Sequence, residues 1–140
     1  MMQEKSFKKQ ISMMLVVAVL ISFSAYLFIV PSSAVTPRWT SILSIDLSIA
    51  FDGTEGTVTG SASKKSTATR IEGTIYLYEL VGDDWVYIDE WYNSRSRGTL
   101  AVSGDFTCAS GVTYKAEFVV TAYTGTTPET ETVESIKQCP

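Results

Sequence analysis

The chain has 140 residues, of which 45% are hydrophobic and 19% charged, and it contains no histidine. The missing histidine excludes the Ser-His-Asp and Cys-His nucleophile arrangements and nearly all zinc and copper ligand sets. The formal net charge of −4 disfavours binding to phosphate backbones, and the length suits a single domain with a short leader.

The N-terminal segment has the three-part layout of a secretory signal peptide. Three lysines precede an apolar run over residues 11–30, and the small residues Ser32 and Ala34 stand at positions −3 and −1 of a cut after Ala34. We therefore expect a signal-peptide helix over residues 1–34 and an exported domain over residues 35–140. The alternative is an uncleaved membrane anchor on the outer face of the cell membrane, because the run is long enough to span a bilayer.

The exported part would hold about 106 residues. Without the three N-terminal lysines and Glu4, it keeps eight basic and 14 acidic side chains, a net charge near −6. The largest basic cluster is Lys64-Lys65, so we expect no nucleic-acid partner. Membrane contact is expected only through the N-terminal segment, and only if that segment is uncleaved.

Strand periodicity begins after Trp39, where every second residue is large and apolar. The predicted core face of this first strand consists of Leu43, Ile45, Leu47, Ile49 and Phe51. Residues 52–56 form a glycine-containing turn, and residues 57–62 alternate small apolar and polar side chains in a second strand. A polar loop over residues 63–67 follows.

The third and fourth strands form a predicted hairpin. The third spans Thr69–Leu80 and places Ile71, Gly73, Ile75 and Leu77 on one face, with Tyr76 and Tyr78 on the other. A turn over residues 82–84 leads to a fourth strand over Trp85–Tyr92. A polar crossing over residues 93–98 separates it from the remainder of the domain.

Three further strands complete the pattern. The fifth has Leu100, Val102, Phe106 and Cys108 in phase, and the sixth alternates from Tyr114 to Ala122. A last turn over residues 125–128 precedes a seventh strand at about Glu131–Gln138. The odd spacing of Val133 and Ile136 there predicts a bulge or a poorly packed end.

Seven short strands separated by turn signals are typical of an all-β, seven-stranded antiparallel immunoglobulin-like sandwich. Residues 111–116 resemble the corner before the sixth strand of immunoglobulin and fibronectin type III domains, where a tyrosine hydrogen-bonds back to the corner. The resemblance makes Tyr114 that structural corner residue. The cysteine pair of antibody domains is missing, because Ala116 stands at the sixth-strand position, and this favours a fibronectin-like or bacterial branch.

The exported part also resembles an uncharacterised family, a domain of unknown function, of short secreted proteins from Gram-positive bacteria. The motifs that carry this resemblance are a strand containing Trp85, Ile88 and Trp91 and the corner at residues 111–115. The resemblance covers nearly all of the exported part, but the motifs that carry it are framework motifs. The resemblance implies a fold and a compartment but no activity.

The two cysteines, Cys108 and Cys139, both lie in the exported part. In an oxidising compartment such a pair is typical of one disulfide, which would hold the C-terminal strand. The competing interpretation is two reduced thiols in a host that rarely forms disulfides.

Carboxylate pairs are the only catalytic option that the composition leaves. Asp89 and Glu90 are neighbours on a predicted strand and point to opposite faces, and Asp83-Asp84 lies in a turn that favours aspartate. No loop has the alternating acidic spacing of a dedicated calcium site. We therefore predict that the protein is not an enzyme and holds no cofactor or metal.

Aromatic residues give the best indication of function. The predicted hairpin concentrates six rings: Tyr76, Tyr78, Trp85, Tyr87, Trp91 and Tyr92. Both tryptophans are expected in the core, because small domains need large buried rings. Tyr76 and Tyr78 share a face with polar residues and form the predicted ligand face.

Two functions fit these features. The first is a secreted or cell-surface, non-catalytic binding module, monomeric, that contacts cell-envelope glycan or protein. The second is a structural protein that self-assembles through exposed edge strands.

Overall fold

The computed structural model describes residues 38–140, and the predicted signal-peptide helix lies outside the described residues. Residues 38–140 contain strands, turns and loops but no helix, so the all-β prediction is confirmed. A helix long and apolar enough to cross a membrane is likewise absent from this range.

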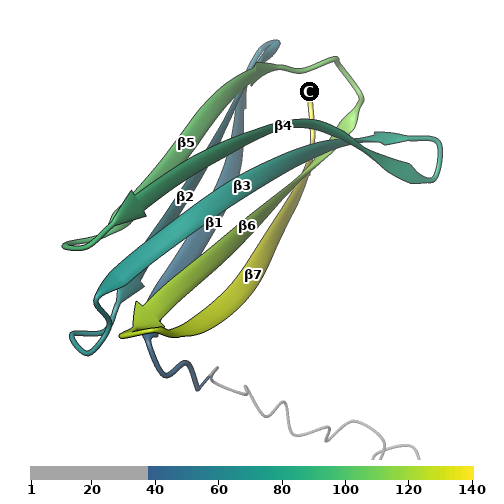
Figure 1. The fold of residues 1–140 in the computed structure, drawn as a ribbon. Helices are drawn as coiled ribbons and strands as arrows, with labels where there is room; N and C mark the ends of the chain where they lie inside the picture. The colour runs from purple at the N-terminus through teal and green to yellow at the C-terminus, as the bar shows by residue number, and fades with distance from the viewer. Residues whose placement is uncertain (1–37) are drawn as a thin grey trace, which may run out of the picture. The chain divides into compact units, whose positions relative to one another are not determined.

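Seven antiparallel strands form two sheets that face each other (Figure 1). One sheet has the order β1-β2-β5 and the other the order β4-β3-β6-β7. The strands are β1 (Ile42–Asp52), β2 (Glu55–Lys64), β3 (Arg70–Val81), β4 (Asp84–Arg95), β5 (Leu100–Thr107), β6 (Thr113–Thr124) and β7 (Thr127–Gln138). Consecutive strands joined by tight turns account for three of the five pairings within sheets, namely β1–β2, β3–β4 and β6–β7, and the β2–β5 and β3–β6 pairings need longer connections.

The hydrophobic core lies between the sheets and is centred on Phe118 of β6, which is fully buried. Gly60 of β2 and Gly73 of β3 leave room for its ring. A Cβ atom on Gly60 would lie 2.8 Å from the Phe118 ring, and one on Gly73 would lie 2.6 Å from it. The predicted inner face of β3 is confirmed, since Ile71, Ile75 and Leu77 are fully buried.

The first strand departs from strict alternation at its start. The register between β1 and β2 shifts between Ile42 and Ser44, so that Ile42 is buried and Leu43 is 63% exposed. The prediction that Leu43 belongs to the core face was therefore wrong. A bulge at this point lets two successive residues exchange the faces that alternation would assign to them.

Two strand boundaries differ from the sequence-based expectation. Strand β4 continues to Arg95, into the segment expected as a polar crossing, and β7 begins at Thr127, within the expected last turn. Of the two alternatives expected for β7, the bulge is absent, because the register with β6 is unbroken, whereas the poorly packed end agrees with the exposure of Ile136. Val133 and Ile136 are instead on opposite faces, with Ile136 57% exposed, which explains their odd spacing.

A carboxylate on β7 holds the start of β1. Glu129 accepts hydrogen bonds from the backbone N–H groups of Thr40 and Ser41, both at 2.6 Å, and of Ile42 at 3.0 Å. Burial raises the pKa of Glu129, but the three backbone hydrogen bonds favour the ionised form more strongly and hold the pKa below its usual range. This contact joins the edges of the two sheets, because β1 and β7 are edge strands of different sheets.

The substitution Glu129→Gln is expected to lower the free energy of unfolding by about 1 kcal/mol near neutral pH, after allowance for solvent screening. The folded-state pKa is depressed, so the contribution is complete above the unfolded pKa and is lost as the pH falls through the folded one. Denaturant unfolding of both proteins across the acidic range should therefore show their difference shrinking at low pH. A difference that stays constant throughout would contradict this role.

A second small core closes the other end of the domain. A disulfide joins Cys108, after β5, to Cys139, after β7, with a Cα–Cα distance of 6.2 Å. The bond packs beside Leu77 and Tyr114, both buried. The Tyr114 hydroxyl accepts a hydrogen bond from the backbone N–H of Ala109 at 2.9 Å, across the β5–β6 connection. The two sheets are thus joined covalently at this end.

Candidate ligand-binding face

A bulge in β4 decides which aromatic residues reach the surface. Leu77 pairs with Asp89 and Tyr78 pairs with Tyr87, so Ile88 is the extra residue. Such an insertion reverses the faces of all residues on one side of it. Trp91, beyond the bulge, therefore shares the inward face of Ile75, its partner on β3.

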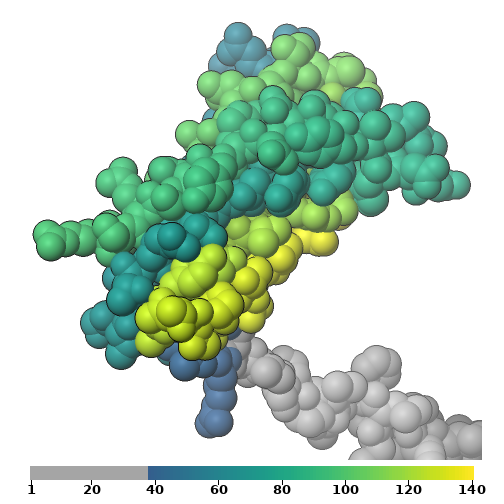
Figure 2. All heavy atoms as spheres, in the orientation of Figure 1, coloured from purple at the N-terminus to yellow at the C-terminus, as the bar shows by residue number. Residues whose placement is uncertain are grey.

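The residues before the bulge point the other way. Trp85 pairs with Leu80, and Tyr87 pairs with Tyr78, on the face opposite the buried Leu77. The outward face of the four-stranded sheet thus collects rings from three strands. They are Tyr76, Tyr78, Trp85, Tyr87, Tyr92 and Tyr123. We call this set the aromatic face. The four-stranded sheet lies in front in Figure 1, and Figure 2 shows all heavy atoms in the same orientation.

The two tryptophans therefore have different environments. Trp91 packs against both core clusters and lies over Gly104 of β5. Trp85 is half-buried and belongs to the outward face. The prediction that both tryptophans are core residues was right for the inward side chain of Trp91 and wrong for Trp85.

Lys115 of β6 occupies the centre of one part of the aromatic face. Its ammonium lies 4.9 Å from the centroid of the Tyr78 ring and 5.1 Å from that of Trp85. It also bonds to Glu117 at 2.6 Å, and this hydrogen bond is the main reason that the pKa of Lys115 is raised. The Lys115 side chain is only 13% exposed. The rings and the carboxylate together make a site that holds an ammonium group.

Carboxylates accompany the neighbouring rings. Tyr76 pairs with Glu90 on one side and with Glu117 on the other. Desolvation and then the charge of Glu117 raise the pKa of Tyr78. Desolvation, followed by the charges of Glu90 and Asp89, raises the pKa of Tyr87. The middle of the aromatic face is therefore electronegative.

A second group of rings lies toward the other end of the face. Glu72 accepts hydrogen bonds from the Tyr123 hydroxyl at 2.7 Å and from the Tyr92 hydroxyl at 3.3 Å. The Arg70 guanidinium lies 4.3 Å from the Tyr123 ring centroid and 3.6 Å from Glu72. These contacts orient Tyr123 and Tyr92, although Tyr92 remains 63% exposed.

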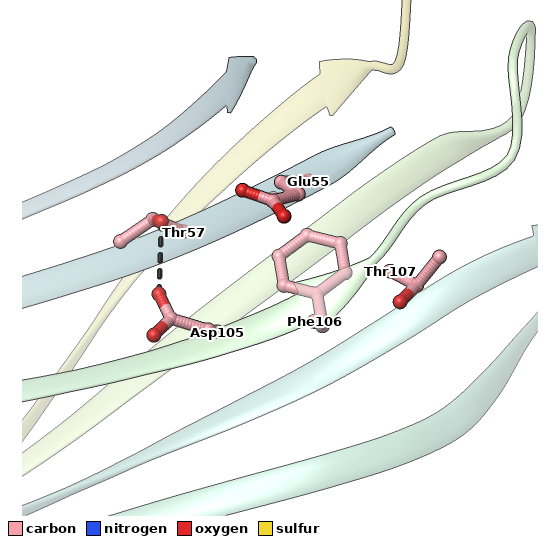
Figure 3. A pocket seen from close by; sticks show the side chains of 6 residues that line it. Glu55, Thr57, Asp105, Phe106 and Thr107 are labelled. Carbon is pink, nitrogen blue, oxygen red and sulfur yellow. Dashed lines mark hydrogen bonds between the residues drawn. The ribbon is translucent and has the colours of Figure 1, made fainter. Parts of the chain in front are cut away.

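A hollow on the other sheet provides a comparison (Figure 3). It is lined by Glu55, Thr57, Asp105 and Phe106 from β2 and β5. The Thr57 hydroxyl donates a hydrogen bond to Asp105 at 2.9 Å, so this carboxylate is engaged within the sheet. The hollow has one ring, whereas the aromatic face has six.

The remaining acidic candidates do not converge. Asp89 and Glu90 have partners on opposite faces of β3, namely Leu77 and Tyr76. Within residues 38–140, no group of three carboxylate or cysteine side chains is placed to hold a metal ion.

Comparisons with known proteins leave the family open. No protein-family model matches the chain, and no curated protein matches it. Among solved structures, the sporulation control protein Spo0M from Bacillus subtilis is similar at a TM-score of 0.36 and 13% sequence identity. That match covers 64% of this chain and 46% of Spo0M, so the chain spans less than half the length of that protein.

Sequence reasoning identified the ring-rich hairpin but missed its charged neighbours. Tyr76 and Tyr78, the predicted ligand face, are half-buried on the outward side. The structure adds Lys115, Glu117 and Glu90 to them. The alternation of Lys115 and Glu117 along one strand was the available signal, because such residues share a face. A flat, rigid face of this kind can stack planar groups and attract cations.

Proposed function

We propose that the protein is an exported, non-catalytic binding module whose aromatic face contacts cell-envelope glycan. The observation that carries this proposal is the bulge at Ile88, which aligns Trp85 and Tyr87 with Tyr76 and Tyr78. Stacking on sugar rings needs flat, exposed aromatic surface on a rigid support, and antiparallel strands supply that support. A protein surface is the second class of ligand that such a face suits.

The contrast between the two sheets supports a specific role for the aromatic face. In the described residues, the outward positions of β2 hold only Glu55, Thr57, Thr59, Ser61 and Ser63. The solvent-facing side of β2, the central strand of that sheet, therefore lacks the rings that the other sheet presents. Tyrosine suits strand surfaces in general, but that preference alone does not concentrate six rings on one side.

We also propose a more specific fold for the two sheets. An immunoglobulin-like sandwich of the fibronectin type III kind is supported by the three-plus-four strand order and by the Tyr114 hydrogen bond in the β5–β6 connection. Membership of the uncharacterised family of short secreted Gram-positive proteins rests on the framework motifs of the sequence. Such scaffolds present ligand sites on faces and loops without a catalytic centre.

Export is supported by the disulfide, since such bonds persist mainly in oxidising compartments. The protein would then be extracellular, or anchored on the outer face of the cell membrane if its N-terminal segment is uncleaved. The absence of histidine supports a non-catalytic role.

Co-sedimentation with insoluble cell-wall material, chitin and cellulose tests the proposal. The parent protein should be retained by at least one of them, and the variant Tyr76→Ala/Tyr78→Ala should bind about tenfold more weakly or less, as expected for loss of central aromatic contacts. Leu43→Ala is the matched control, because Leu43 is 63% exposed on the other sheet. Equal retention of all three proteins, or of none, would remove the aromatic face as a glycan site.

Self-assembly through edge strands is the second candidate, and the β4 edge bears on it. The Asp89 carboxylate accepts a hydrogen bond from the Glu90 N–H at 2.8 Å, and Asn93 accepts one from the Ser94 N–H at 2.9 Å. The Asn93 side chain also donates to the Ala101 carbonyl of β5 at 2.8 Å. Bulges and inward-pointing polar side chains are devices that discourage edge pairing, so they favour a monomeric binding module. Size-exclusion chromatography at two concentrations separates the candidates, and a concentration-dependent dimer would support assembly.

A further inference from the structure

We infer that the aromatic face selects glycans that carry free, protonated amino groups, and that Tyr76, Tyr87 and Glu90 receive one such group. This inference rests on the proposed function and names the chemical class of its ligand. Amino-sugar polymers without N-acetyl groups belong to this class, whereas neutral polysaccharides do not.

Lys115 is an example, within this protein, of an ammonium group bound by the aromatic face. Its ammonium is held by two rings and one carboxylate, from Tyr78, Trp85 and Glu117. The side chain remains charged although only 13% of it is exposed, because the carboxylate bond favours the protonated form. The same face therefore has the geometry and charge to hold an ammonium group largely out of water.

The adjoining half of the face repeats this set of groups. Tyr76 on β3 and Glu90 on β4 are directly paired. Tyr87, on the other side of the β4 bulge, pairs with Tyr78, the next outward residue of β3 after Tyr76. Cross-strand partners have Cβ atoms about 5 Å apart, within reach of a shared ligand. The set again contains two rings and one carboxylate, but no salt bridge between the described residues includes this carboxylate.

The negative charge of Glu90 in this half of the face has no salt-bridge partner among the described residues. In the region that the structure describes, the salt bridges of this face join Arg70 to Glu72 and Lys115 to Glu117. Glu90 takes part in neither. A ligand ammonium would supply the missing positive charge and would lie over rings whose faces are electronegative.

The shape of the face favours a glycan over a basic peptide. Extended peptides usually bind by adding a strand to a sheet edge or by lying in a groove. The β4 edge is occupied by the Asp89 and Asn93 side chains, and the rings point outward from the sheet. Sugar rings, which present a C–H face for stacking and can carry amino substituents, match a surface of aromatic rings and carboxylates.

The test compares two soluble probes, a glucosamine hexamer and an N-acetylglucosamine hexamer, by isothermal titration calorimetry at a pH where the free amines are protonated. The parent should bind the glucosamine hexamer about tenfold more tightly, and this preference should decline at high salt. Glu90→Gln should reduce the preference to about twofold or less. Glu55→Gln, on the outward side of β2, is the matched control and should keep it.

Equal affinity of the parent for both hexamers would overturn the inference while leaving the proposed function intact. An unchanged preference in Glu90→Gln, with an unchanged denaturation midpoint, would overturn the assigned residues. Binding of a lysine-rich peptide that displaces the hexamer and exceeds its affinity would replace a glycan by a basic protein segment. Absence of binding to either hexamer and to all insoluble glycans would reject the proposed function itself.

Discussion

Removal of the disulfide is expected to lower the free energy of unfolding by about 3.7 kcal/mol, because the bond closes a loop of about 31 residues in the unfolded chain. Cys108 and Cys139 follow edge strands of different sheets, so the bond also limits separation of the sheets at that end. Guanidinium denaturation of Cys108→Ala/Cys139→Ala should therefore show a markedly lower midpoint than the oxidised parent. Both half-cystines are buried, and their loss also removes packing beside Leu77 and Tyr114.

Reduction of the parent separates the covalent effect from the packing effect. If the chain constraint dominates, the reduced parent should match the double variant in its free energy of unfolding within about 1 kcal/mol. Identical midpoints for the oxidised and reduced parent would contradict a stabilising bond. Intact mass measurement before and after reduction establishes which form each sample contains.

The substitution Gly104→Val is expected to lower the free energy of unfolding by about 3 kcal/mol, through overpacking against Trp91. Gly104 faces inward on β5, and a Cβ atom there would overlap the indole ring. Trp91 packs against both core clusters, so a shift of its ring would disturb contacts in both. The same substitution would move the β4 edge that carries the aromatic face.

Two further variants test whether the effect of Gly104→Val comes from overlap with Trp91. Ser103→Val changes the neighbouring, exposed position of β5 and should leave the denaturation midpoint nearly unchanged. Trp91→Leu should be destabilising alone but should relieve part of the effect of Gly104→Val, giving a coupling energy of about 1 kcal/mol or more in a double-mutant cycle. Additive effects of the two substitutions would show that Trp91 and Gly104 do not share the space assigned to them.

Sequence periodicity was sufficient where one face of a strand is apolar and the other polar. In β3, Ile71, Ile75 and Leu77 alternate with polar residues and tyrosines, and all three are fully buried. The same reasoning failed at Leu43 and in β4. At both places a bulge breaks the alternation, and large apolar residues occupy both faces, so local pattern alone carries no preference for either register.

The amino-acid sequence by itself determined the class of fold, the seven strands and the lack of histidine-dependent chemistry. These follow from local properties: alternation of side chains, turn residues and composition. Only the tertiary structure decided that Trp85 is outward and Trp91 inward. That choice depends on Gly104, which lies in another strand and another sheet and leaves the space that the Trp91 ring fills. The residues that accompany the aromatic face, such as Glu90 and Lys115, meet through cross-strand register, which alternation along one strand does not specify.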